Sequence, residues 1–372
     1  MSASPFTGRL ARVREQMSAT GVDVLLLSVG ADLPWLCGYE AMPLERLTML
    51  VVPADGDATL VVPKLEAPRV VERDDLFTLR PWGETEHPVD IVAGLVGSAG
   101  TVAIGDTTWA RFLVELLEAR PGVRFVRGVE VTGDLRARKD PHEIGALERA
   151  GAAVDRIAVE LQRGDIALVG RTEAEVSAEL GRRILAEGHQ RVNFAIVAAG
   201  PDAASPHHEP GERVIGEGEV VLCDFGGTMH DEFGVGYCSD ITRCVWTGEI
   251  PAEAAEIYGL LAGAHGAAFD AATLGVACEA VDAAARAHIV DGGYGEWFVH
   301  RTGHGIGVEA HEDPYIVEGN TEPLAAGHAF SIEPGIYLPD RFGFRLEDCL
   351  AVTEEGVRPF TRCDHRLVPV DA

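Results

Sequence analysis

Three histidines in one short run of this chain suggest metal or acid–base chemistry. The run HRTGHGIGVEAHEDP, from His300 to Pro314, holds three of the thirteen histidines of the chain. The spacings HxxxH and HxxxxxxH also arise by chance, so the run alone does not establish a metal site. Whether the histidines have partners depends on the acidic residues elsewhere in the chain.

Four acidic residues stand among apolar and β-branched neighbours in strand-like segments. Asp is disfavoured inside strands, and burying an unpaired carboxylate is costly. Taken singly, each is more often a solvated charge at a sheet edge, but four together would repel one another unless cations neutralised them. Because carboxylates dominate the donors, we expect two divalent cations, Mn²⁺ first, with Co²⁺, Fe²⁺ and Zn²⁺ as alternatives. The predicted ligand set is Asp224, Asp240, His304, Glu333 and Glu347.

The first third of the chain alternates helical and strand patterns. A helical stripe in RLARVREQMSATG precedes the apolar run VDVLLLSV. The segment LTMLVVPADGDATLVVPK predicts a β-hairpin that turns at Asp55-Gly56-Asp57. Further strands are expected at TVAIGD and RFVRGVEV, with a helix at WARFLVELLEARPG between them. We therefore predict an α/β domain over residues 1–135.

A second domain is predicted over residues 136–372. Its first part contains two patterns typical of the N-terminus of a helix. Asp140 is placed to cap a helix, Pro141 suits its first turn, and Glu143 completes a capping box. Thr172 and Glu175 repeat the pattern for the next helix. These signals predict two consecutive helices at the start of the domain.

The second domain also looks internally duplicated. PHHEP followed by EGEVVLCDFGG resembles AHEDP followed by AGHAFSIEPGIY. In both copies a glycine precedes an acidic residue by six positions, Gly218 before Asp224 and Gly327 before Glu333. Chance similarity is the alternative for such short strings. If the repeat is real, two facing half-domains would bring the carboxylates and histidines to one cleft.

Composition excludes several classes of partner and location. The net charge of -28 repels phosphate backbones and anionic membranes, so we expect neither nucleic acid nor a membrane as a partner. The seven cysteines are dispersed with no CxxC pair, which is typical of reduced thiols. The N-terminus has no apolar signal-peptide core, and no stretch of about 18 apolar residues occurs. These features predict a cytoplasmic protein.

Taken together, these motifs resemble the five-ligand signature of the pita-bread metallopeptidases. The resemblance rests on DFGG…SDITR, HRTGHGIGVEAHEDP, SIEPGIY and RLED, and covers about residue 135 to the C-terminus. That superfamily contains prolidases, aminopeptidases P and methionine aminopeptidases. The first domain resembles the creatinase-type N-terminal domain through its pattern and WLCGYE. The fold implied is a creatinase-like α/β domain plus an α+β pita-bread domain with a pseudo-two-fold repeat.

One departure from the family pattern concerns the two aspartates. They lie sixteen residues apart here, whereas the family usually places them eleven apart. The extra residues fall in TMHDEFGVG, which we predict to be a long loop with a polar, solvated tip. Its His230, Asp231 and Glu232 are alternative ligands, and the loop could alter substrate access.

The resemblance also implies a role for each metal ligand. Asp224 would bind one cation, His304 and Glu333 the other, and Asp240 and Glu347 would bridge the pair. Two cations sharing a water would supply hydroxide to attack the scissile carbonyl. Glu333 would carry the proton to the leaving nitrogen.

Five further residues have expected roles near the metals. His311 matches the family position of a donor to the oxyanion, and His207 resembles a substrate-binding histidine, so both are assigned to catalysis and substrate binding. His300 and His208 are expected to support structure. Arg345 would orient the bridging carboxylate or meet a substrate carboxylate, and a surface ion pair is the alternative.

The function expected from the resemblance is a prolidase that hydrolyses Xaa-Pro dipeptides. The alternatives are an aminopeptidase P acting on longer Xaa-Pro peptides, and a non-peptide hydrolase or lyase on the same scaffold. A binding protein without catalysis is disfavoured because all five ligand positions are filled. The resemblance implies a homodimer and a small peptide as substrate.

Overall fold

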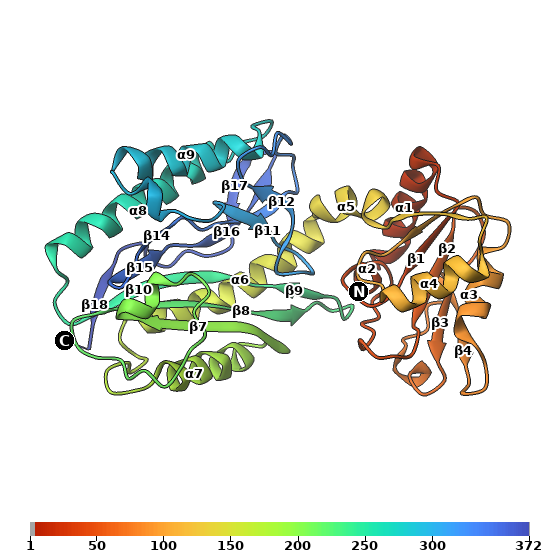
Figure 1. The fold of residues 1–372 in the computed structure, drawn as a ribbon, viewed down its shortest axis with the longest axis horizontal. Coiled ribbons are helices and arrows are strands. Elements are labelled where there is room, and N and C mark those ends of the chain that lie inside the picture. The colour runs from red at the N-terminus through yellow and green to blue at the C-terminus, as the bar shows by residue number, and fades with distance from the viewer. Residues whose placement is uncertain (1–3, 372) are drawn as a thin grey trace. The chain divides into compact units, whose positions relative to one another are not determined.

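The computed structural model describes residues 4–371 of the chain, which fold as two compact units (Figure 1). Unit 1 holds the residues up to Arg136 together with Asp231–Gly236, and unit 2 holds the rest. Over the described residues, no helix combines the length and apolar character that crossing a bilayer requires.

Unit 1 is built on one six-stranded sheet with the order β4-β3-β2-β1-β5-β6. The β2–β3 hairpin is antiparallel, as predicted, and β5 and β6 continue parallel from β1. The apolar face packs on the helices through residues such as Leu26, Val92 and Leu116. The strands are β1 Val24–Leu27, β2 Met49–Pro53, β3 Ala58–Pro63, β4 Phe77–Trp82, β5 Thr101–Ile104 and β6 Arg124–Arg127. The helices are α1 Phe6–Thr20, α2 Asp32–Cys37, the short η1 Ala67–Arg69, α3 Pro88–Val96, α4 Ala110–Ala119 and α5 Val129–Ala137.

The strand predicted over RFVRGVEV is wrong in its second half. The strand β6 ends at Arg127, and α5 begins two residues later. Gly128 lies where the chain turns: a Cβ there would meet the Cα of Gly105 at 2.8 Å. The Gly128 carbonyl then accepts from the amide of Thr132 at 3.0 Å, which opens the helix. Close backbone approach therefore overrides the β-branched residues that follow.

The first half of unit 2 places two helices on a sheet. Both predicted capping boxes are present, with Asp140 bonded to Glu143 and Thr172 bonded to Glu175. The sheet order is β18-β10-β8-β7, and β9 pairs with β8. The elements are α6 Pro141–Gln162, α7 Glu173–Ala186, β7 Arg191–Ala199, the short η2 Gly200–Ala204, β8 Val220–His230, β9 Gly236–Cys238, β10 Ile241–Thr247 and β18 Val368–Val370.

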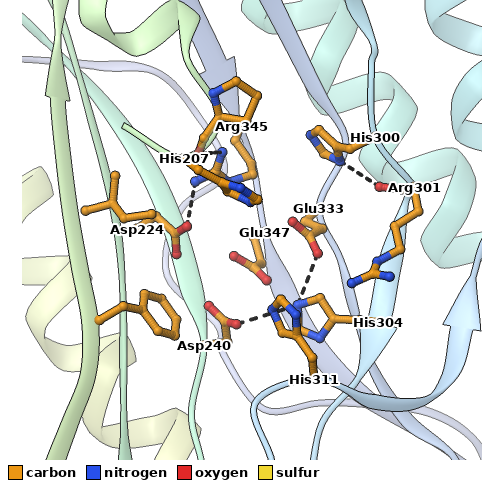
Figure 2. Close-up of a pocket in the computed structure, with 13 residues that line it drawn as sticks. His207, Asp224, Asp240, His300, Arg301, His304, His311, Glu333, Arg345 and Glu347 are labelled. Atoms are coloured by element: carbon orange, nitrogen blue, oxygen red, sulfur yellow. Dashed lines mark hydrogen bonds and ion pairs between the residues drawn. The ribbon is translucent and has the colours of Figure 1, made fainter. Parts of the chain in front are cut away.

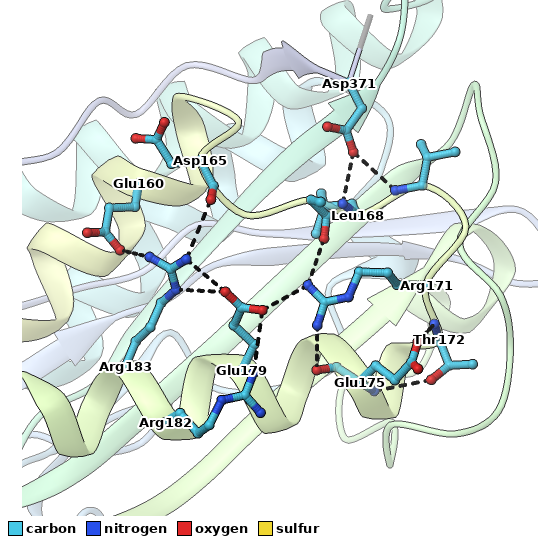
Figure 3. Close-up of polar contacts among 12 residues, drawn as sticks. Glu160, Asp165, Leu168, Arg171, Thr172, Glu175, Glu179, Arg182, Arg183 and Asp371 are labelled. Atoms are coloured by element: carbon cyan, nitrogen blue, oxygen red, sulfur yellow. Dashed lines mark hydrogen bonds and ion pairs between the residues drawn. The ribbon is translucent and has the colours of Figure 1, made fainter.

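Polar contacts join the two helices of this half (Figure 3). Arg183 of α7 bonds to Glu179 of the same helix at 2.7 Å and to Glu160 of α6. The carboxylate of Asp371 accepts from the amides of Leu168 and Val169, at 2.9 and 3.0 Å. Asp371 is therefore held to the connection between α6 and α7.

The second half of unit 2 repeats this plan with another pair of helices. Its main sheet has the order β12-β11-β13-β16-β17, and β14 pairs with β15. The succession β16-β13-β11 repeats β10-β8-β7 of the first half, and an isolated bridge between Thr242 and Glu347 joins the two halves. The elements are α8 Ala252–Ala271, α9 Cys278–Asp291, the short η3 Gly295–Trp297, β11 Gly303–Gly305, β12 Glu312–Ile316, β13 Ala329–Ile332, β14 Gly335–Leu338, β15 Phe342–Arg345, β16 Asp348–Thr353 and β17 Gly356–Pro359.

The loop predicted between the two aspartates is shorter than expected and its tip is not fully solvated. The strand β8 continues to His230 and β9 begins at Gly236, so only residues 231–235 of the predicted loop TMHDEFGVG lie outside the strands. The buried Asp231 accepts from the amides of Phe233 and Val235, at 2.9 and 2.8 Å. The tip forms part of unit 1, where Phe233 lies edge-on to Phe6. The predicted solvated tip is therefore wrong for Asp231.

The seven cysteines are all free, as the dispersed pattern predicts, and the structure shows that all of them are buried. Six of them lie in unit 2 and one in unit 1. They are Cys37, Cys223, Cys238, Cys244, Cys278, Cys349 and Cys363.

Candidate metal centre

A cavity of about 470 Å³ in unit 2 contains every residue that the sequence assigned to the site (Figure 2). Its floor is acidic, and one wall is apolar where β7 contributes Phe194 and Ile196. The assigned residues that line it are His207, Asp224, Asp240, His304, His311, Glu333, Arg345 and Glu347.

Both halves of unit 2 contribute carboxylates from equivalent positions. Asp224 lies within β8, and Asp240 stands immediately before β10. In the other half, Glu333 follows β13 directly and Glu347 stands immediately before β16. His304 is the middle residue of β11. The duplicated strand order therefore accounts for the convergence of four acidic residues on one cavity.

Two glycines let the ligand-bearing segments approach one another. A Cβ on Gly226 would lie 2.0 Å from the carbonyl oxygen of Ser239, the neighbour of Asp240. A Cβ on Gly303 would lie 1.8 Å from the carbonyl oxygen of Ser331, two residues before Glu333. No side chain fits at either position, so glycine is required for the close backbone contact.

The five predicted ligands form two groups that share Glu347. One group is Asp224, Asp240 and Glu347, and the other is His304, Glu333 and Glu347; in each, the candidate ligand atoms lie within 4.8 Å of one another. His304 Nε2 lies 3.1 Å from Glu333 Oε1 and 3.7 Å from Asp240 Oδ2. This arrangement fits two neighbouring cations with Glu347 between them.

The acidic floor has buried oxygens without protein partners. Within the described part of the chain, no donor reaches Asp224 Oδ1, Asp240 Oδ1 or Glu347 Oε1. Burial, with the charges of Glu347 and Asp224, raises the pKa of Asp240 well above its usual range. Burial, with the charges of Glu333 and Asp224, does the same to the pKa of Glu347. Unpaired buried carboxylate oxygens are costly, and divalent cations would compensate that cost.

His304 and Glu333 are oriented by Ser331. The Ser331 hydroxyl accepts from the His304 amide at 3.0 Å and donates to Glu333 Oε1 at 3.1 Å. His304 Nδ1 lies 3.1 Å from the carbonyl of Gly305, which favours the tautomer that leaves Nε2 free for a cation. Burial alone would raise the pKa of Glu333, but the hydrogen bond and charge of His304 outweigh it and lower that pKa to about 2.

Arg345 is buried and contacts Asp224 rather than Glu347. Its Nη2 donates to Asp224 Oδ2 at 2.5 Å and its Nη1 to the Tyr337 hydroxyl at 2.9 Å. Its Nε donates at 3.1 Å to Thr242, whose own hydroxyl donates to Glu347 Oε2 at 2.7 Å. Each nitrogen of Arg345 thus donates to a protein acceptor, and its predicted part in substrate binding stays a prediction.

The two histidines assigned to catalysis stand at opposite sides of the ligand groups (Figure 2). The His311 ring lies beside the His304 ring, with centroids 3.9 Å apart and planes tilted by 37°. Burial and the charge of His304 lower the pKa of His311 to about 4. His207 is exposed to the cavity, and among the described residues no hydrogen bond or ion pair reaches its ring.

His300 lies in the cavity wall and is held by two contacts. Its Nδ1 is 2.7 Å from the carbonyl of Arg301, and its Nε2 is 2.9 Å from the Tyr337 hydroxyl. Burial lowers the pKa of His300. Neither nitrogen is free for a cation, in keeping with the supporting role expected for this residue.

Several residues of the centre were missed from the sequence. Thr242 and Ser331 each lie two residues from a ligand and so share its strand face, a pattern that could have identified them. Arg301 lines the cavity with its guanidinium 4.3 Å from the ring centre of Tyr315. Nothing in its local sequence distinguishes it from a surface arginine. Tyr337 is recognised only through its contacts with Arg345 and His300.

Comparison with known proteins shows similarity over the whole chain. Metallopeptidase family M24 matches residues 145–354, and the creatinase/prolidase N-terminal domain matches residues 9–138. The chain is 41% identical to a probable dipeptidase PepE of Mycobacterium tuberculosis, over 99% of this chain and 97% of the relative. It is 34% identical to an Xaa-Pro dipeptidase of Lactobacillus helveticus, over 97% and 99%. A crystal structure of Thermococcus sibiricus prolidase superposes with a TM-score of 0.91 at 32% identity, over 99% and 100%.

Proposed function

This chain belongs to metallopeptidase family M24, and we propose that it is an Xaa-Pro dipeptidase that works with two divalent cations at the candidate metal centre. Membership of the family makes it a peptidase. The observation that carries the proposal is the pair of ligand groups that share Glu347 in one cavity. The names of the Lactobacillus and Thermococcus relatives support Xaa-Pro dipeptides as substrates.

The donor set fits hard divalent cations. Asp224 would hold one cation, His304 and Glu333 the other, and Asp240 and Glu347 would lie between them. Four carboxylates and one imidazole favour Mn²⁺, although Co²⁺, Fe²⁺ and Zn²⁺ accept the same donors. When bound, such a pair of cations lowers the pKa of a shared water and polarises the scissile carbonyl.

The protein side chains supply proton transfer and orientation. In the cation-free protein the hydrogen bond and charge of His304 lower the pKa of Glu333 to about 2, so Glu333 is ionised at neutral pH. An ionised carboxylate at this position would take a proton from the attacking water and pass it to the leaving nitrogen. His311, neutral because its pKa is lowered to about 4, can donate a hydrogen bond to the developing oxyanion. His207 would bind the substrate from the opposite side of the cavity.

Two features of the cavity suit a dipeptide that ends in proline. Phe194, Ile196 and Pro206 form an apolar wall against which a pyrrolidine ring could pack. Arg301 provides a cation beside the cavity, and among the described residues no carboxylate lies within ion-pair distance of it. A free substrate carboxylate is the partner that this guanidinium lacks. A dipeptide presents that group one residue from the scissile bond, whereas a longer peptide does not.

The test compares Ala-Pro with Ala-Pro-Ala on the Mn²⁺-loaded protein, with a chelated sample and a Glu333→Ala variant alongside. We expect faster cleavage of Ala-Pro, abolished in both controls. Preference for Ala-Pro-Ala would instead make the protein an Xaa-Pro aminopeptidase. Bound metal with no cleavage of either peptide would refute both assignments and direct attention to non-peptide amides.

A further inference from the structure

We propose that Glu173 and His208 form a positioning pair that holds His207 against the cavity, so that Glu173 acts on the substrate only through this turn. The inference rests on the proposed function, because it concerns how the substrate-binding wall of that cavity is built. Neither residue lines the cavity itself.

His207 occupies a tight turn whose ends are fixed by other residues. The amide of His208 donates to the carbonyl of Ser205 at 3.2 Å, which makes a β-turn with Pro206 and His207 as its central residues. Proline suits the first central position because its φ is already set for the turn. The turn projects His207 toward the cavity, while the next residue points away from it to Glu173.

Glu173 is a fully buried carboxylate at the first turn of α7. One oxygen accepts from the amide of Ala199 at 2.8 Å, at the end of β7. The other accepts from His208 Nε2 at 2.7 Å and from the amide of Gly211 at 3.2 Å. A helix N-terminus favours negative charge, so the carboxylate is stabilised where it stands. A single side chain thus ties the helix and the strand to the segment 208–211.

The turn has a second anchor on the cavity side. Arg345 Nη1 donates to the carbonyl of Pro206 at 3.1 Å, and the same guanidinium bonds to Asp224. The position of His207 is therefore set by Arg345 on one side and by the contact of His208 with Glu173 on the other. Because no hydrogen bond or ion pair fixes the His207 ring itself among the described residues, these anchors carry its placement.

His208 pairs with Glu173 rather than with the other acidic groups nearby. Asp202 Oδ2 lies 3.9 Å from His208 Nε2, beyond hydrogen-bond distance, and 3.5 Å from Arg213 Nε. Arg213 in turn bonds to Glu219 at 2.5 Å. The neighbouring charges are thus directed at Arg213, which leaves the buried carboxylate of Glu173 for the histidine.

The decisive experiment is a double-mutant cycle on the Mn²⁺-loaded protein with Ala-Pro as substrate. Because misplacing a contact by about 1 Å can lower a rate roughly 100-fold, we expect His208→Ala to lower kcat/KM by roughly 10- to 100-fold. In a His207→Ala background the same change should cost little more, since the group it positions is gone. His208→Gln, which can still donate to Glu173, should recover most of the activity.

An equal loss in both backgrounds would overturn the proposal, because it would show that His208 acts on the fold rather than through His207. His87→Ala is the matched control, since this exposed histidine pairs with Asp90 in unit 1 and should leave kcat/KM unchanged. Thermal midpoints of all variants are measured in parallel to separate lost stability from lost positioning.

A second measurement does not require turnover. The imidazole NMR signal of His207, assigned by its loss in His207→Ala, is followed in the Zn²⁺-loaded protein. We expect it to shift and broaden in His208→Ala while the His311 signal stays in place. An unchanged His207 signal would contradict the inference even if the protein cleaved no Xaa-Pro dipeptide, whereas absence of cleavage with a shifted signal would refute only the proposed function.

Discussion

Thr242 is an uncharged residue whose hydroxyl group orients two charged residues of the metal centre, Glu347 and Arg345. Its hydroxyl donates to Glu347 Oε2 and accepts from Arg345 Nε, so one oxygen orients both a predicted shared ligand and the arginine that bonds to Asp224. Groups that orient metal ligands contribute to affinity although they do not touch the cation.

Replacing Thr242 should therefore weaken metal binding. In Thr242→Val the shape of the side chain is kept and both hydrogen bonds are lost, so we expect the affinity for Mn²⁺ to fall about 10- to 100-fold. Thr242→Ser keeps the hydroxyl and should bind nearly as the parent does. Competition with a metallochromic chelator measures the affinity of both variants for Mn²⁺. Equal affinities of Thr242→Val and Thr242→Ser would rule out this role.

Arg301 should set the preference for a free substrate carboxylate. Because a charged hydrogen bond contributes about 1.5–3 kcal/mol, we expect Arg301→Ala to raise KM for Ala-Pro by roughly 10- to 100-fold. Cleavage of Ala-Pro-amide, which lacks the carboxylate, should change little. Arg341→Ala, at an arginine paired with Glu253 on the surface, serves as the control. A parallel loss on both substrates would assign Arg301 to the fold instead.

The sequence could identify residues by type and spacing but not by contact. The five predicted ligands, His207 and His311 do line one cavity, because each stood in a motif with a recognisable setting. Arg345 was found by its place two residues before Glu347, yet its bond to Asp224 joins positions that are far apart in the sequence. Arg301 and Tyr337 were missed for the same reason: their roles depend on three-dimensional neighbours.

At the scale of secondary-structure elements, the centre depends on close contacts between backbones. Gly303 in β11 lies against the carbonyl of Ser331 in β13, and this contact brings His304 to Glu333. A side chain at this position would force the two strands apart.

Gly303→Ala should therefore damage both stability and metal binding. We expect a loss of about 1–3 kcal/mol in the free energy of unfolding, as for other overpacked sites, together with weaker Mn²⁺ binding. Gly259→Ala provides a control of opposite sign: this exposed glycine inside α8 has open space around it, and alanine there should stabilise by about 0.5–1 kcal/mol. Denaturant unfolding measures both, and a neutral Gly303→Ala would contradict the close contact.

Elements with strong local signals were predicted well, and elements shaped by tertiary contacts were not. The capping residues of α6 and α7 act as expected because a capping box is encoded within four residues. A strand was wrongly predicted after Arg127 because the β-branched residues there favour one. Gly128 ends the strand instead, and glycine is required there because the backbone passes close to Gly105. The burial of Asp231 depends on packing in unit 1, which hairpin composition does not reveal.

For the molecule as a whole, the fold class could be predicted from the sequence. The relation between the two halves of unit 2 could be predicted only in part. The creatinase-like domain and the M24 domain are both confirmed by the family matches. The weak internal repeat corresponds to a shared strand order, which short glycine-rich strings could suggest but not establish. The bridge between Thr242 and Glu347 that joins the halves had no counterpart in the sequence pattern.

The stabilisation of the protein by metal should grow with pH. The pKa values of Asp240 and Glu347 are raised in the folded, cation-free protein. The two protonated carboxyl groups therefore contribute fully to stability below the pKa that they have in the unfolded chain, and this contribution is lost as the pH rises through their pKa in the folded protein. Cations replace these protons, so the gain in Tm with Mn²⁺ should be larger at pH 7.5 than at pH 5.5. Thermal unfolding at fixed free Mn²⁺ measures this, and a gain that does not vary with pH would contradict it.

The reactivity of the seven buried thiols reports where and how often the folded chain opens locally. Burial raises the pKa of Cys37 and Cys244 to about 12 and that of Cys238 to about 11, so alkylating reagents meet almost no thiolate in the folded protein. Labelling then requires a segment to open, and its rate reports the free energy of that opening. With one thiol in unit 1 and six in unit 2, pulsed alkylation followed by peptide mass mapping would time the loosening of each unit without any engineered probe.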